Sequence, residues 1–235
     1  MKYIFIHIGK TAGTSFRTFL ESNVSRPYWG YAKTYVLTHE DLDIRNPSKF
    51  IELEPKGHTV FEHFDLFSEH APWGLHRYLK TKDYQYIAML REPVSRTISA
   101  YRYAIDRGWI TGDKNIIDWF HTKENRDKEH YQLNYCSGVP IDAPSEVKLD
   151  KALSNLKDDK FLFGLTNRYD EFIDICCGIN NWKPQYRTTN VTKTNKEIAT
   201  EDREKLKELL ADEIMFYDEA VKIYNEKYKS FIKND

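Results

Sequence analysis

Short apolar runs alternate along the chain with stretches whose apolar residues recur at helical spacing. The apolar runs at residues 3–8, 58–64, 84–90 and 161–165 are rich in β-branched or aromatic side chains and predict four strands. Helical spacing of apolar residues predicts three helices, at residues 15–21, from Pro93 to Gly108, and at residues 169–177. Strands that alternate with helices predict an α/β fold with a mainly parallel central sheet and helices on both faces.

The last quarter of the chain is more polar. Gly178 is placed to close the third helix. Residues 179–199 are rich in Asn and Thr, and a loop of that length inside a compact domain is usually functional. Thr200 is placed to cap a charged amphipathic helix that breaks near Asp212.

Composition narrows the class of protein. A chain of 235 residues, 40% of them hydrophobic, predicts one folded domain over residues 1–235. A net charge of -1 argues against a nucleic-acid partner. The three cysteines (Cys136, Cys176 and Cys177) follow neither a disulfide framework nor a metal-ligand spacing. With no apolar run of membrane-spanning length, we expect a cytoplasmic protein without a membrane span or a metal.

The first apolar run leads through small residues into a helix. The connecting segment reads Gly9-Lys10-Thr11-Ala12-Gly13-Thr14-Ser15. A helix N-terminus presents unpaired backbone N–H groups and the positive end of the helix dipole. Lys10 adds a cation and the hydroxyl side chains add donors, so the segment predicts a site for a phosphate or phosphosulfate group.

The order of residues in this turn excludes the common ATPase loop. That loop places its lysine directly after the second glycine, whereas Lys10 precedes Gly13. No acidic residue stands out as a magnesium ligand either. A nucleotide kinase, such as an adenylyl sulfate kinase, is therefore the less favoured alternative, as is a non-catalytic module that binds a nucleotide or a glycan.

A second segment follows the third predicted strand and supports the same interpretation. Arg91 stands at the strand end, where α/β folds bind ligands, and Ser99 lies two helical turns further on. Arginine gives a bidentate contact to phosphate and serine a directional hydroxyl, so both can meet one phosphate. Ser95 and Arg96, between them, are expected to be an ordinary helix serine and a surface arginine.

Together the two segments resemble the carbohydrate sulfotransferase family that includes the heparan sulfate 2-O- and 6-O-sulfotransferases. The family motifs read approximately Pro-Lys-Thr-Gly-Gly-Thr-Ser and Arg-Asp-Pro-Val-x-Arg-x-x-Ser-x-Tyr. Here the corresponding stretches are residues 9–15 and 91–101, and Gly164-Leu165-Thr166-Asn167 is similar to a third family motif, Gly-Leu-Thr-Glu. Four positions depart from the pattern: Gly9 stands for Pro, Ala12 for Gly, Glu92 for Asp and Asn167 for Glu.

This resemblance implies a P-loop-like domain that binds 3'-phosphoadenosine 5'-phosphosulfate (PAPS) and needs no metal. It assigns Lys10, Thr11, Ala12, Gly13, Thr14 and Ser15 to the 5'-phosphosulfate, and Arg91 and Ser99 to the 3'-phosphate. A loop near residues 190–195 would close over the nucleotide, with Lys193 as a phosphate contact. Ala12 is tolerable in place of glycine unless the position needs a positive φ.

Sulfuryl transfer also needs a base for the acceptor hydroxyl and a cation at the departing oxygen. Lys10 suits the second role. The resemblance points to His58 as the base, because several family members carry Gly-His at this place. His63 is the runner-up and Glu62 stays possible, since some relatives use glutamate.

The acceptor would be a hydroxyl-bearing small molecule or glycan that lies over the sulfur. Five side chains could stack on a sugar ring or pair with its acidic groups, and each could equally serve packing: Trp73, Tyr101, Arg102, Tyr103 and Trp109.

Overall fold

The computed structural model of the chain describes residues 1–24, 34–35, 65–70, 72–122, 131–186 and 194–232. Its sheet has five strands in the order β2-β3-β1-β4-β5, and every neighbouring pair is parallel. The strands are β1 (Lys2–Ile6), β2 (Thr34–Tyr35), β3 (Leu66–Glu69), β4 (Tyr84–Leu90) and β5 (Phe161–Leu165). The predicted parallel α/β sheet is confirmed.

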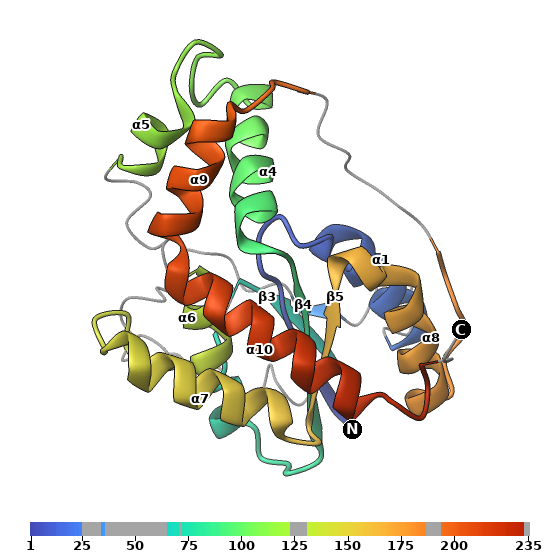
Figure 1. Ribbon diagram of the computed structural model, residues 1–235. Coiled ribbons are helices and arrows are strands. Elements are labelled where there is room, and N and C mark those ends of the chain that lie inside the picture. The colour runs from blue at the N-terminus through green and yellow to red at the C-terminus, as the bar shows by residue number, and fades with distance from the viewer. Residues whose placement is uncertain (25–33, 36–64, 71, 123–130, 187–193, 233–235) are drawn as a thin grey trace.

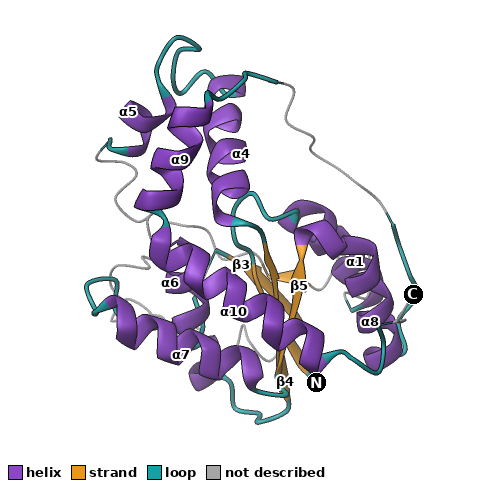
Figure 2. Cartoon of the chain, in the orientation of Figure 1, coloured by secondary structure: helices purple, strands orange, loops and turns teal. Residues whose placement is uncertain are grey.

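Helices cover both faces of this sheet. The described helices are α1 (Gly13–Asn23), α4 (Pro93–Asp106), α5 (Ile116–Phe120), α6 (Tyr131–Ser137), α7 (Ser145–Lys157), α8 (Tyr169–Asn180), α9 (Thr200–Leu209) and α10 (Ala211–Lys227), with 3-10 turns at Leu75–Tyr78 and Thr166–Arg168. Figure 1 and Figure 2 show α1 and α8 on one side of the sheet and α6, α7 and α10 on the other. The arrangement is the three-layer fold that the sequence predicts.

The main hydrophobic core lies on both faces of the sheet. Every residue of β5 is buried, and so is every residue of β4 after Tyr84. Burial on both faces explains why these strands show no regular polar alternation, with Gln85 the one polar side chain in them. Phe16 of α1 and Phe172 of α8 are fully buried and stack on each other with ring centroids 5.4 Å apart. The two helices thus share one aromatic layer over the sheet.

A second, smaller core lies away from the sheet, between α4, α5 and α9. Its buried members are Val94, Ile98, Tyr101, Ala104, Ile116, Ile117, Trp119, Phe120, Ile198, Leu206 and Leu210. Tyr101 and Trp119 are in contact, with ring centroids 5.4 Å apart. Helix α4 therefore begins at the sheet and ends in a cluster with apolar contacts of its own.

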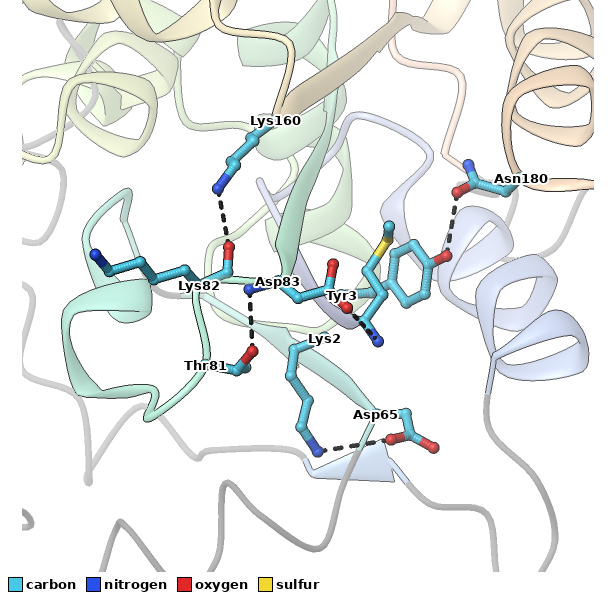
Figure 3. A network of polar contacts seen from close by, with 9 residues as sticks. Lys2, Tyr3, Asp65, Thr81, Lys82, Asp83, Lys160 and Asn180 are labelled. Atoms are coloured by element: carbon cyan, nitrogen blue, oxygen red, sulfur yellow. Dashed lines mark hydrogen bonds and ion pairs between the residues drawn. The ribbon is translucent and has the colours of Figure 1, made fainter.

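Polar contacts hold the edge of the sheet where the strands begin. Figure 3 shows this network, in which Lys2 Nζ lies 3.6 Å from Asp65 Oδ1, Tyr3 Oη donates to Asn180 Oδ1 at 3.1 Å, and Lys160 Nζ donates to Lys82 O at 2.8 Å. These groups belong to β1, to the residues that precede β3, β4 and β5, and to Asn180 at the end of α8. The opposite edge, at the carboxyl ends of the strands, carries the candidate site.

Several element boundaries differ from those predicted. The strand expected at residues 58–64 lies outside the described residues, while β3 forms at Leu66–Glu69. Gly178 does not close α8, which runs to Asn180 and ends at Asn181 in the left-handed conformation (φ 55°). Asparagine tolerates that conformation through local hydrogen bonding, so no glycine is needed.

The C-terminal helices also differ in detail. The N-cap of α9 is Ala199 and not Thr200, and no side chain caps this helix. The break before α10 falls at Leu210, two residues before the predicted position. The sequence did not predict α5, α6 or α7.

Candidate active site at the carboxyl edge of the sheet

The loop between β1 and α1 has the backbone of an anion-binding turn. Lys10 (φ 69°) and Ala12 (φ 64°) are both left-handed, and Ala12 is the N-cap of α1. Left-handed residues in a tight turn aim neighbouring backbone N–H groups into one concavity. No acidic residue lies in the first turn of α1, so nothing there opposes a bound anion. Ala12 therefore occupies a position where the family resemblance has glycine and where positive φ is required.

Two residues fix the shape of this loop. The Thr11 hydroxyl is fully buried and donates to Ile8 O at 2.8 Å, so its proton is used inside the loop. Gly13 faces the ring of His7, and a Cβ at Gly13 would lie 2.2 Å from His7 Cδ2. A side chain at residue 13 would therefore have to displace the histidine. Thr14 and Ser15 lie in the first turn of α1, as expected.

Lys10 carries the cation of the loop. Its Nζ lies 4.0 Å from the centroid of the Tyr103 ring on α4. Burial lowers the pKa of Lys10, and the nearby Arg91 lowers it further. Arg107 contacts the same tyrosine, because its Nε donates to Tyr103 Oη at 2.8 Å. The ammonium thus rests on an aromatic face in the part of the site that adjoins α4.

Arg91 follows β4 and lies beside the loop. Its Nη1 donates to Lys10 O at 3.2 Å, which joins the two sequence segments in space. Glu92 caps α4, since its carboxylate accepts from Val94 N at 2.8 Å and from Ser95 N at 2.7 Å. The substitution of glutamate for the family's aspartate therefore keeps an N-cap. Ser99 lies half-buried on α4, two turns further on.

Arg96 contradicts the expectation of a surface side chain. It is only 2% exposed, and its guanidinium lies 4.4 Å from the centroid of the Tyr131 ring. Burial lowers its pKa, while the nearby Glu213 carboxylate raises it. A buried arginine requires such compensation, which comes from α6 and α10 and could not be read from its own helix.

Two histidines lie next to the loop at the same edge of the sheet. His7 follows β1 and His70 follows β3, and the parallel register pairs Ile6 with Glu69. Their rings stack with centroids 4.6 Å apart. Burial, followed by His70 and Arg17, lowers the pKa of His7 to about 3. His7 therefore stays neutral and lies between Gly13 and His70.

His70 was not among the candidates drawn from the sequence. No local sequence pattern indicates that His70 lies near the loop, because only the parallel pairing of β1 with β3 brings it there. The four side chains His58, Glu62, His63 and Lys193, which were proposed as base or phosphate ligand, lie outside the described residues.

The five side chains proposed to bind the acceptor fall into two groups, those that are used in packing or internal hydrogen bonds and those that are exposed. Trp73 and Tyr101 are buried in the two cores, and Arg102 donates to Lys196 O at 2.7 Å and 3.1 Å. Tyr103 and Trp109 contact each other edge to face, and Trp109 is 70% exposed. Of the five, only this pair combines exposed aromatic surface with proximity to Lys10.

Comparison with known proteins identifies the family of this chain. A family model described as the sulfotransferase family matches residues 1–231. The chain belongs to the sulfotransferase family. Membership makes the protein a transferase. No curated protein sequence matches this sulfotransferase significantly.

A solved structure has the same fold. A crystal structure of a sulfotransferase from Alicyclobacillus acidocaldarius superposes with a TM-score of 0.52 at 14% sequence identity. The match covers 97% of this chain and 96% of that one. At this identity the similarity supports the architecture alone. Within the described residues, no helix is both long and apolar enough to cross a bilayer.

Proposed function

We propose that this sulfotransferase moves a sulfuryl group from PAPS to a hydroxyl of a carbohydrate acceptor. The observation that carries the proposal is the contact between the two predicted nucleotide segments, in which Arg91 Nη1 donates to Lys10 O at 3.2 Å. It brings two cations and a helix N-terminus to one edge of the sheet. PAPS carries a 5'-phosphosulfate and a separate 3'-phosphate, so it fits a site with two cationic positions.

The donor set fits each end of the nucleotide. The loop from Lys10 to Ser15 offers a helix N-terminus without an acidic residue, which suits the 5'-phosphosulfate. Arg91, which follows β4, and Ser99, two turns further on in α4, suit the 3'-phosphate. Lys193 remains a proposed third phosphate contact. Because the loop itself supplies the positive field, the chemistry requires no metal.

The proposed reaction is an in-line displacement at sulfur. The acceptor oxygen forms a bond to sulfur as the bond from sulfur to the bridging phosphate oxygen breaks. The hydroxyl proton passes to a base, and the electron pair of the broken bond stays on the departing 3'-phosphoadenosine 5'-phosphate. Lys10 contributes to catalysis by neutralising the charge that develops on this oxygen. Its lowered pKa favours donation of a hydrogen bond or a proton at that moment.

The proposed base is His58, with His63 and Glu62 as alternatives. The geometry of the described residues adds His70, which stacks on His7 beside the loop. His7 is the weaker candidate, because a pKa of about 3 makes it a poor proton acceptor near neutral pH. Replacing His58 and His70 by alanine, one at a time, separates them. The true base variant should lose turnover and keep nucleotide affinity, whereas the other should keep both.

The proposal further places the enzyme in the cytoplasm. Cys136, Cys176 and Cys177 are all unpaired, and burial raises the pKa of each thiol. Unpaired, protonated thiols support a reducing compartment.

Thermal unfolding with added nucleotides tests the cofactor assignment. A ligand at 100 times its dissociation constant adds about 2.7 kcal/mol to stability. We expect a higher midpoint with 3'-phosphoadenosine 5'-phosphate and a much smaller change with ATP or AMP. An equal shift with ATP would favour a kinase and refute the assignment. Transfer of labelled sulfate from PAPS to a saccharide panel then tests the acceptor class, with an inactive Lys10→Ala variant as the control.

A further inference from the structure

Gln132 of α6 holds the backbone of Arg91 on both sides. Arg91 N donates to Gln132 Oε1 at 2.9 Å, and Gln132 Nε2 donates to Arg91 O at 2.8 Å. The side-chain amide thereby makes the pair of contacts that a neighbouring strand would make, one residue beyond the end of β4. Gln132 is fully buried, so water cannot replace these bonds without a rearrangement.

Glu213 of α10 holds Gln132 in turn. Its Oε2 accepts from Gln132 Nε2 at 3.3 Å, and its Oε1 accepts from Leu133 N at 2.7 Å, in the first turn of α6. Glu213 is fully buried. One carboxylate thus fixes both the amide that touches Arg91 and the helix that carries the amide.

Glu213 lies near the buried Arg96, and each side chain favours the charged form of the other. Burial raises the pKa of Glu213 to about 7, although Arg96 lowers it, and burial lowers the pKa of Arg96, although Glu213 raises it. A buried ionic cluster of this kind adds little to stability compared with well-packed apolar residues. Its value is geometric, since the hydrogen bonds that join Glu213 to Gln132 and Leu133, and Gln132 to Arg91, connect α10, α6 and the start of α4 in one arrangement.

Arg91 is therefore held at both ends. Gln132 fixes its peptide groups, and Lys10 O accepts from its guanidinium at 3.2 Å. The guanidinium consequently has a set position relative to the loop that would receive the 5'-phosphosulfate. The nucleotide carries its 3'-phosphate at a fixed distance from its 5'-phosphosulfate, so the two groups of the protein that bind them must also be held at a fixed distance.

We propose that Gln132 and Glu213 are positioning residues that hold Arg91 for the 3'-phosphate of the nucleotide. The inference rests on the proposed function, because it requires that Arg91 contacts this phosphate.

Isothermal titration with two nucleotides tests the inference. Gln132→Met keeps the volume and removes both bonds to Arg91, and Glu213→Gln keeps the shape and removes the charge. Asn155→Leu is the matched control, because Asn155 is a buried amide that bonds Cys136 O and Ser137 O of the same α6 and does not touch Arg91. The ligands are 3'-phosphoadenosine 5'-phosphate and AMP, which lacks the 3'-phosphate.

We expect Gln132→Met to bind the 3'-phosphorylated nucleotide roughly tenfold or more weakly, and AMP within about twofold of wild type. Glu213→Gln should show a smaller loss of the same kind, and it serves as the readout if Gln132→Met does not fold. Asn155→Leu should lose stability without losing the preference for the 3'-phosphate. In an Arg91→Ala background, Gln132→Met should cause no further loss.

Two outcomes would overturn the inference in distinguishable ways. If wild type prefers the 3'-phosphorylated nucleotide and the Gln132 and Glu213 variants keep that preference, positioning is refuted and the proposed function stands. If wild type shows no such preference, or Arg91→Ala leaves it unchanged, the cofactor assignment of Arg91 fails and the positioning role fails with it.

Discussion

Replacing Ala12 by glycine should stabilise this protein, although the change removes a methyl group from a helix N-terminus. Ala12 has φ 64° and ψ 16°, in the left-handed region. An L-residue pays roughly 1–2 kcal/mol there, because its Cβ approaches the following carbonyl. Glycine carries no Cβ and adopts the same backbone without strain. The strain at residue 12 should therefore disappear in Ala12→Gly.

The expected gain is smaller than the strain. Glycine makes the unfolded chain more flexible, which offsets about 0.4–1 kcal/mol. The difference leaves a net stabilisation of about 0.5–1 kcal/mol. For a domain of this size, 1 kcal/mol moves the unfolding midpoint by roughly 2–4 °C.

The assay is urea unfolding of wild type, Ala12→Gly and Ala100→Gly. Ala100 lies inside α4 in the right-handed conformation, where the same substitution should destabilise by about 1 kcal/mol. The two variants should consequently move the urea midpoint in opposite directions. If Ala12→Gly destabilises the protein as Ala100→Gly does, the left-handed strain at residue 12 is not a cost, and the account of the loop given above is wrong.

Three further predictions concern the same edge of the sheet. Gly13→Ala places a Cβ 2.2 Å from His7 Cδ2, so it should lower the unfolding free energy by about 1–3 kcal/mol and weaken nucleotide binding, as calorimetry and urea unfolding would show. Burial lowers the pKa of His7 to about 3, so the unfolding free energy keeps its full value above pH 6.5 and falls by about 1.4 kcal/mol per pH unit between pH 6.5 and about 3. His7→Phe should remove this slope in urea unfolding, and a His7 pKa near 6.5 by NMR would contradict it. Glu92→Ala removes the cap of α4 and should cost about 1 kcal/mol in urea unfolding, whereas Glu92→Asp should keep most of the stability.

The strands show which parts of the fold the sequence predicts well. β4 and β5 match their predicted residues 84–90 and 161–165, because a doubly covered parallel strand is an uninterrupted apolar run. β1 ends two residues earlier than predicted, since His7 and Ile8 already belong to the turn. The sequence also carries a signal for α7 that was missed, since apolar residues recur there at helical spacing: Leu149, Ala152, Leu153 and Leu156.

In the candidate site, too, the sequence predicts the local segments but not the contacts that form only in the folded chain. The turn at residues 9–15 and the segment after β4 carry local signals, and the structure brings them together. Gln132, which bonds the backbone of Arg91, and Glu213, which lies near Arg96, come from α6 and α10, more than 30 residues further along the chain. His70 reaches the loop only through strand pairing. No periodicity in the sequence records such contacts, so burial of Arg96 and the role of Gln132 had to come from the structure.

The separate apolar cluster between α4, α5 and α9 has a consequence for local unfolding of the molecule. A structural unit with its own core can open without global unfolding, and amide hydrogen exchange would detect this as a cooperative block of weaker protection. Ser99 lies on the helix that joins the cluster to the sheet, whereas the anion loop belongs to the sheet. A nucleotide that spans both would have to be released before the block opens. Slower exchange in α5 and α9 upon nucleotide binding would thus report, far from the ligand, that the two cores had become one cooperative unit.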